Sequence, residues 1–196
     1  MRRILVLALA ATATALVAGC ETPQMSGPSP SSMGPPPALQ PRPFAPLGFD
    51  ANEFAWSSAL GSNAVIARVQ YHAASGALWS CSGQTIALIP RTRYSAARMR
   101  SLYESDDHAV VPVEVVKSRD AARPGVDYGR FVRTAACDAR NSFVFDHLPD
   151  GGFFIIARAV PKAKAPAAAD TGVVVMQRVE VRNGAGLKLT LPIAQQ

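Results

Sequence analysis

The chain has 196 residues, and 20 lysines and arginines against 14 aspartates and glutamates give it a formal net charge of +6. Hydrophobic residues make up 48% of it, which is enough for one globular core. The basic residues are spread along the sequence and do not form the dense clusters of a nucleic-acid-binding protein, so that class is excluded.

The first nineteen residues have the layout of a secretory signal peptide. Arg2 and Arg3 form a short basic region, and residues 4–18 are an unbroken run of apolar and small side chains. These fifteen residues fall short of the roughly 20 that a membrane-spanning helix needs. We therefore expect residues 1–19 to be removed on export, which lowers the net charge to +4.

The end of this segment, Leu16-Val17-Ala18-Gly19-Cys20, resembles the bacterial lipobox. The resemblance implies a lipoprotein whose Cys20 thiol carries a diacylglycerol and whose amine carries a further fatty acid such as palmitate. Two or three acyl chains give stable membrane anchoring. The alternative is an ordinary secretory signal with an incidental cysteine. Glu21 follows in place of the aspartate associated with inner-membrane retention, so we expect the outer membrane, facing the periplasm.

The two remaining cysteines, Cys81 and Cys137, form an even pair. An exported protein meets an oxidising compartment, where such a pair favours a disulfide. Metal ligation is the competing interpretation, but neither cysteine has a second cysteine or a histidine at ligand spacing. The sequence predicts a Cys81–Cys137 disulfide and no metal site.

Residues 20–48 contain nine prolines among serine, glycine and glutamine. A segment of this composition cannot bury enough apolar surface to offset the entropy lost on ordering, so we expect a disordered tether behind the lipidated cysteine. The domain boundaries predicted are 1–19 for the signal, 20–48 for the linker and 49–196 for a folded domain.

The folded domain shows the two-residue periodicity of strands. Val65, Ala67, Val69 and Tyr71 alternate with more polar positions, and similar patterns recur to the end of the chain. About seven short strands separated by turn signals predict a single antiparallel β-sandwich of the immunoglobulin or transthyretin kind. The expected strands cover residues 65–71, 85–89, 129–136, 142–146, 153–160, 173–181 and 187–193.

Three local features qualify this pattern. Residues 95–104 predict one short helix insertion capped by Ser95. Pro112 restricts any strand over 110–116 to a sheet edge. The Asn183-Gly184 dipeptide favours a tight hairpin between the last two strands.

The most specific motif in the domain runs from Asp138 to Phe154. Its polar turn, Phe143-x-Phe145 pair and Leu148-Pro149-x-Gly151 sequence resemble the signature of carboxypeptidase regulatory-like domains, which have a transthyretin-like or carbohydrate-binding-like fold. The resemblance implies that the two phenylalanines point into a sandwich, that Leu148 closes its end, and that Cys81 and Cys137 meet near one end. Asn141 replaces the family's usual glycine and tolerates a left-handed backbone.

No catalytic motif is present, so we expect a non-enzymatic protein without a cofactor. The expected role is that of an envelope lipoprotein whose sandwich contacts a protein partner or gives structural support. A carbohydrate- or peptidoglycan-binding module on the same fold is the alternative. An anionic glycan would be held by arginines and aromatic rings through bidentate hydrogen bonds and stacking. The candidate ligand-binding residues are Arg91, Arg93, Arg98, Arg100, Tyr94 and Trp79.

Overall fold

The computed structural model of the chain describes residues 48–162 and 171–193. The predictions for the signal peptide, for Cys20 and for the proline-rich tether fall outside these residues and stay predictions. In the part of the chain that is described, no helix is both long and apolar enough to cross a membrane.

The domain is mainly β, as predicted, with ten strands, two α-helices and two short 3₁₀ helices among the described residues. The helical elements are η1 (Ala51–Ser58), α1 (Arg93–Tyr103), α2 (Val113–Ala122) and η2 (Gly129–Phe131). The strands are β1 (Asn63–Val69), β2 (Tyr71–His72), β3 (Leu78–Ser80), β4 (Thr85–Pro90), β5 (His108–Pro112), β6 (Arg133–Ala136), β7 (Ser142–Leu148), β8 (Gly151–Pro161), β9 (Val173–Val181) and β10 (Gly186–Leu191).

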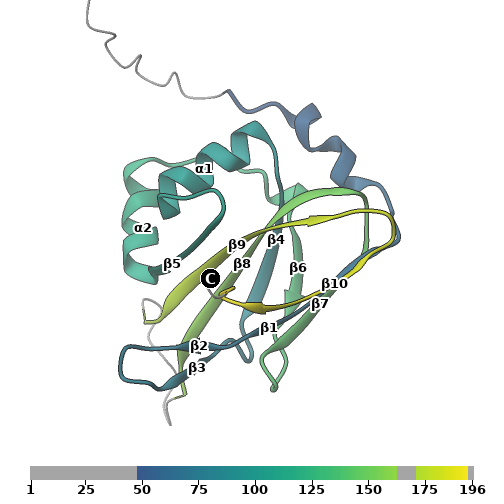
Figure 1. Ribbon diagram of the computed structural model, residues 1–196. Helices are drawn as coiled ribbons and strands as arrows, with labels where there is room; N and C mark the ends of the chain where they lie inside the picture. The colour runs from purple at the N-terminus through teal and green to yellow at the C-terminus, as the bar shows by residue number, and fades with distance from the viewer. Residues whose placement is uncertain (1–47, 163–170, 194–196) are drawn as a thin grey trace, which may run out of the picture. The chain divides into compact units, whose positions relative to one another are not determined.

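Two sheets form the sandwich (Figure 1). The small sheet has the order β10–β1–β7, in which β1 pairs antiparallel with β7 and parallel with β10. In the large sheet, β8 pairs with β4 on one side and β9 on the other, and β6 and β5 lie outside these two strands. The β2–β3 hairpin continues the large sheet at the far end of β8. The β1–β10 pair departs from the purely antiparallel sandwich that was predicted.

The first core lies between the two sheets. It is formed by the inward side chains of alternating positions, among them Val65 and Ala67 of β1 and Phe153 and Ile155 of β8. The motif residues behave as the sequence predicted, because Phe143, Phe145 and Leu148 are all buried in this core. Asn141 has a φ of 62°, the left-handed conformation that an asparagine accepts at low cost.

The second core lies on the opposite face of the large sheet, beneath α1 and α2 (Figure 1). Phe154 and Met176 face this side, while their neighbours Phe153 and Val175 face the first core. Strands β8 and β9 are therefore buried on both faces, which explains their nearly continuous runs of apolar residues. Beyond Gln177 the helices no longer cover β9, and Arg178 and Glu180 are exposed there.

The buried amide of Asn63 joins three parts of the chain at one end of the sandwich. Its Nδ2 donates to Leu148 O (3.0 Å) and to Asp150 Oδ1 (2.8 Å), and its Oδ1 accepts from Ala185 N (2.9 Å). Asn63 is only 1% exposed, so these hydrogen bonds form away from water. We call this arrangement the Asn63 clasp.

The clasp explains why the predicted hairpin between the last two strands is wrong. Asn183 and Gly184 do form a turn with φ values of 58° and 72°, as a tight hairpin needs. However, β9 pairs only with β5 and β8, whereas β10 crosses to the small sheet and pairs with β1. Because Ala185 is bonded to Asn63, the chain leaving the turn is directed to β1.

The helical insertion is larger than the single short helix expected. Thr92 caps α1 and Ser95 is the third helical residue of a reciprocal capping box, so the helix begins two residues earlier than predicted. Residues 113–116 were expected in a strand but begin α2. Pro112 ends edge strand β5, and burial of Val113 against the second core outweighs the low helix propensity of valine.

The two-faced burial of β8 makes Phe154 a sensitive position. Its side chain is fully buried beneath α1 and α2, so Phe154→Ala is expected to lower the free energy of unfolding by about 3–5 kcal/mol. Val144→Ala serves as the control, since Val144 is 53% exposed and its truncation should cost no more than about 0.5 kcal/mol. Urea unfolding measures both. Equal stability of the two variants would contradict a second core.

Candidate functional site

The junction between β4 and α1 brings arginine side chains together. Arg91 N donates to Gly152 O (2.8 Å), which fixes the chain as it leaves the sheet. Ser95 N then donates to Thr92 Oγ1 (3.0 Å), and Ser95 Oγ donates to Pro90 O (2.7 Å). These bonds hold the first turn of α1 against the end of β4. The backbone of Arg91, Thr92 and Arg93, which connects β4 to α1, is therefore fixed in place.

A cleft of about 400 Å³ opens at this junction. Arg93, Ala96 and Arg100 are spaced by three and four residues and so share one face of α1. The small Ala96 side chain leaves room between the two arginines, and Arg91 approaches from the end of β4. We call this site the arginine cleft; its lining residues are Arg91, Thr92, Arg93, Ala96, Arg100 and Asp106.

Two arginines of the cleft are held by carboxylates that sequence reasoning missed. Arg93 Nε donates to Glu53 Oε1 of η1 (2.6 Å), and Arg100 pairs with Asp106 in the turn after α1. Both pairs are partly exposed to solvent, where an ion pair contributes at most about 1 kcal/mol. An anionic ligand can therefore compete with Glu53 and Asp106 at little cost.

Arg91 is the arginine of the cleft with no ion pair to a described residue. Its aliphatic stem packs over Gly152, where an added Cβ would lie 3.2 Å from Arg91 Cδ. The pKa of the nearby Glu180 carboxyl is lowered mainly by its hydrogen bond to Arg182, with weaker contributions from Arg91 and Arg178. Arg91 thus brings to the cleft a positive charge that no carboxylate of the described residues pairs with directly.

Two of the other candidate residues, Arg98 and Tyr94, lie on a different face of α1. The Arg98 side chain is only 9% exposed and binds the carboxylate of Asp120 and the main-chain oxygen of Arg123. Tyr94 Oη accepts from Val126 N (2.6 Å). Together they tie α1 to the last turn of α2 and to the segment that follows it. They do not line the arginine cleft.

The remaining candidate, Trp79, lies at the opposite end of β8. It pairs in register with Pro161, nine residues from Gly152, which corresponds to roughly 30 Å along a strand. Its ring meets Tyr71 edge to face with centroids 5.5 Å apart, and both pack against the first core. The structure therefore separates Trp79 from the arginines with which the sequence grouped it.

An aromatic cluster accounts for other rings near the start of α1. Phe54 stacks on Phe131 and Tyr128 with centroid distances of 5.0 and 5.6 Å, and Phe49 contacts both Phe54 and Tyr94. These residues hold η1 against α1 and η2. In the sequence they are up to about 80 residues apart, and no periodic pattern links them.

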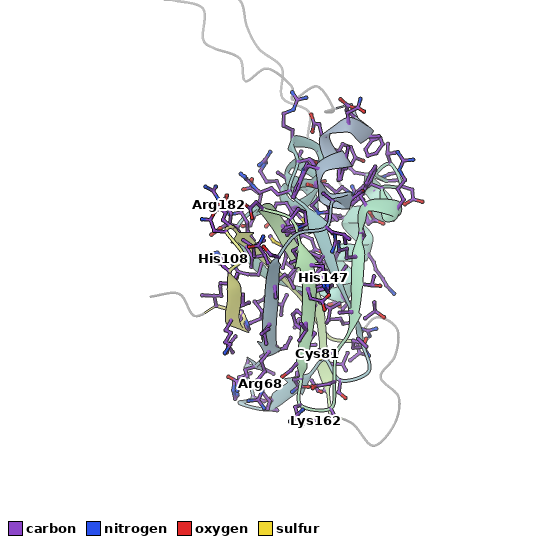
Figure 2. All side chains as sticks on the ribbon, turned by 90° about the vertical axis from the view of Figure 1, so that its right-hand side faces the viewer. Arg68, Cys81, His108, His147, Lys162 and Arg182 are labelled. Atoms are coloured by element: carbon purple, nitrogen blue, oxygen red, sulfur yellow. A yellow bond between two sulfur atoms is a disulfide. The ribbon has the colours of Figure 1, made fainter. Side chains whose placement is uncertain are left out.

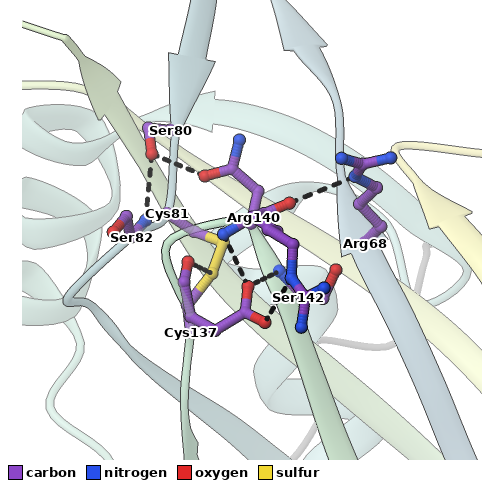
Figure 3. The surroundings of a disulfide bond; sticks show 9 residues. Arg68, Ser80, Cys81, Ser82, Cys137, Arg140 and Ser142 are labelled. Carbon is purple, nitrogen blue, oxygen red and sulfur yellow. Dashed lines mark hydrogen bonds and ion pairs between the residues drawn. A yellow bond between two sulfur atoms is a disulfide. The ribbon is translucent and has the colours of Figure 1, made fainter.

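The predicted disulfide is present between Cys81 and Cys137, whose Cα atoms are 5.8 Å apart (Figure 3). The two cysteines are 56 positions apart in the sequence, and closing a loop of that length corresponds to about 4 kcal/mol of stabilisation in the chain-entropy model. Figure 2 shows Cys81 and Arg68 toward one end of the sandwich and Arg182 toward the other.

A polar network surrounds the disulfide. Asp138 Oδ1 accepts from Ser142 N and Arg140 N, both at 2.8 Å, and these hydrogen bonds lower the pKa of the carboxyl below its usual value of 3.8. Ser80 Oγ donates to Asn141 Oδ1, and Arg68 Nε donates to Arg140 O (3.1 Å; Figure 3). Every one of these groups stabilises the turn before β7.

The three histidines interact with their own sequence neighbours. His108 Nδ1 lies 3.0 Å from Asp107, His147 Nδ1 lies 3.3 Å from Asp146, and His72 Nδ1 lies 3.4 Å from Gly76 O. Within residues 48–162 and 171–193, no group of three or more His, Cys, Asp or Glu side chains is placed to hold a metal ion.

Comparison with known proteins shows a similarity in fold to a solved structure. No protein-family model matches the chain, and no curated protein matches it. A solved structure, the crystal structure of a candidate carbohydrate-binding protein from Pseudomonas aeruginosa, is similar with a TM-score of 0.53 and 23% sequence identity. The match covers 72% of this chain and 97% of the other. This similarity supports the sandwich fold and fits the carbohydrate-binding-like fold that the Asp138–Phe154 motif implied.

Proposed function

We propose that this protein is a lipid-anchored binding module of the bacterial cell envelope that binds an anionic glycan in the arginine cleft. The observation that carries the proposal is the convergence of Arg91, Arg93 and Arg100 on one cleft, with Arg91 free of any ion pair among the described residues. The similarity in fold to a candidate carbohydrate-binding protein is consistent with it.

The chemistry of the cleft favours an acidic sugar over a neutral one. A planar guanidinium donates two parallel hydrogen bonds to a carboxylate or a sulfate, and such charge-assisted bonds are about twice as strong as neutral ones. Asp106 and Thr92 add acceptors for sugar hydroxyl groups. No aromatic ring lines the cleft, so stacking on a sugar face contributes little.

The membrane anchor rests on the sequence. The basic start, the short apolar run and the lipobox-like residues before Cys20 support export and lipidation, and Glu21 supports the outer membrane. A domain tethered in the periplasm would meet the acidic polysaccharides of the envelope. Binding without catalysis is the proposed role, because no catalytic motif was found in the sequence.

Glycan binding can be tested with two double variants of equal charge. Arg91→Ser with Arg100→Ser removes two cations from the cleft, and Arg68→Ser with Arg140→Ser removes two from the disulfide end. Calorimetric titration with polygalacturonate should show an affinity lower by about tenfold or more for the cleft variant, since a hydrogen bond to a charged group contributes about 1.5–3 kcal/mol.

The disulfide-end variant is the control and should bind like the wild type. Neutral dextran of the same length should bind far more weakly than polygalacturonate. Equal loss of binding in both double variants would show a diffuse charge effect and contradict the cleft.

The anchor is tested by Cys20→Ser. This substitution removes the thiol that would carry the diacylglycerol, so the protein should move from the membrane fraction to the soluble periplasmic fraction. Intact-mass analysis of the wild type should show fatty chains on a polypeptide that begins at Cys20. A wild-type protein with an unprocessed leader and no lipid would refute the proposed anchor.

A further inference from the structure

Strand β10 is an open edge of the small sheet. It pairs with β1 on one side, and no described strand pairs with its other side. Ala64 N donates to Ala185 O (3.0 Å) and Gln70 N donates to Leu191 O (2.7 Å), so odd-numbered residues of β10 direct their main chain at β1. Because successive residues of a strand alternate, the main-chain groups of Lys188 and Thr190 point outward.

A groove of about 550 Å³ runs beside this edge. It lies between β10 and the last residues of β9, beyond Gln177, which is the last residue of β9 in register with β5. Apolar side chains provide most of its lining, and Ile193 at its margin is 47% exposed. Its principal apolar residues are Val179, Leu187, Leu189, Pro192 and Ile193.

The charged residues of the groove are mainly basic. Arg178 and Lys188 line it together with one carboxylate, Glu180. Glu180 is already paired with Arg182, whereas Lys188 has no ion pair to a described residue. An occupant with acidic side chains next to Lys188 would therefore complement the groove.

We infer that β10 docks an extended segment of a partner protein, which adds a strand to the small sheet. The main chain of that segment would pair with Lys188 and Thr190. Its apolar side chains would enter the groove over Val179, Leu187 and Leu189, and its acidic side chains would lie beside Lys188. This site is separate from the arginine cleft and does not depend on glycan binding.

A partner segment fits this edge better than a second copy of the chain. Two β10 strands that pair antiparallel about their middle would place Lys188 opposite Lys188. Like charges in directly opposed positions destabilise a strand pair, and lysines on edge strands commonly prevent such self-association. An acidic strand of alternating polarity meets no such repulsion.

An unpaired acceptor lies on β9 two residues before Val179, just outside the lining of the groove. Gln177 precedes Val179 by two residues on the same face of β9 and is 6% exposed. Its Nε2 donates to Arg178 O (3.0 Å), but its Oε1 has no hydrogen-bond partner among the described residues. We therefore place threonine at both ends of the probe peptide, so that a hydroxyl donor lies on the Gln177 side of the groove in either orientation.

The probe is the peptide Thr-Glu-Val-Glu-Val-Glu-Thr, in which the threonines and valines share one face and the glutamates the other. A scrambled peptide of equal composition is measured beside it. Fluorescence anisotropy should show binding of the alternating peptide by the wild type. Thr190→Pro removes an outward N–H without removing a bond to β1, and it should weaken binding by about tenfold. Lys188→Glu should weaken it through charge repulsion while it leaves the backbone intact.

The matched control is Val144→Pro on β7, the opposite edge of the same sheet. Val69 N donates to Asn141 O, so even-numbered residues of β7 also face outward, and this variant should bind like the wild type. The inference is overturned if the wild type does not bind the alternating peptide, or if Thr190→Pro binds it as tightly. It is also overturned if sedimentation shows a wild-type dimer that Thr190→Pro dissociates.

Discussion

The fold depends on the burial of β8 and β9 on both faces. Phe153 and Val175 fill the space between the sheets, while their neighbours Phe154 and Met176 fill the space under the helices. Each of these two adjacent strands thus contributes side chains to both cores. A side chain on one face cannot move without disturbing the backbone that positions the other, so the helical layer is tied to the sandwich.

This arrangement positions both proposed binding surfaces. The arginine cleft forms where β4 leaves the large sheet and α1 begins, next to Gly152 of β8. The groove beside β10 exists because the Asn63 clasp sends the last strand to the small sheet and leaves the end of β9 uncovered. A hairpin between β9 and β10 would have closed that side of the sandwich. The surface features therefore follow from the strand order.

Local patterns predicted much of the fold from the sequence. Alternating polarity located most strands, the Phe143-x-Phe145 motif gave the orientation of β7, and the compartment implied by the leader predicted the disulfide. The course of β10 was not predictable, because it depends on hydrogen bonds between Asn63 and residues 85 and 122 positions away. Helix α2 was missed because its valines favour strands and only packing makes them helical.

The candidate site was predictable only in part. Arginines at 91, 93 and 100 lie close in sequence, and the start of α1 keeps them together. Helical spacing turns Arg98 and Tyr94 to another face, and the length of β8 separates Trp79. Their partners Glu53 and Asp106 are recognised only in three dimensions, because nothing in the sequence connects η1 with α1.

Native-state hydrogen exchange of the wild-type domain tests the two-faced burial of β8 and β9 most directly. If these strands join both cores, their amides should be the slowest to exchange and should open only with global unfolding. Amides of α1 should then lose protection no faster than those of β1. The account would be contradicted if β8 and β9 exchanged earlier than β1 and β7 through a separate opening of the helical layer.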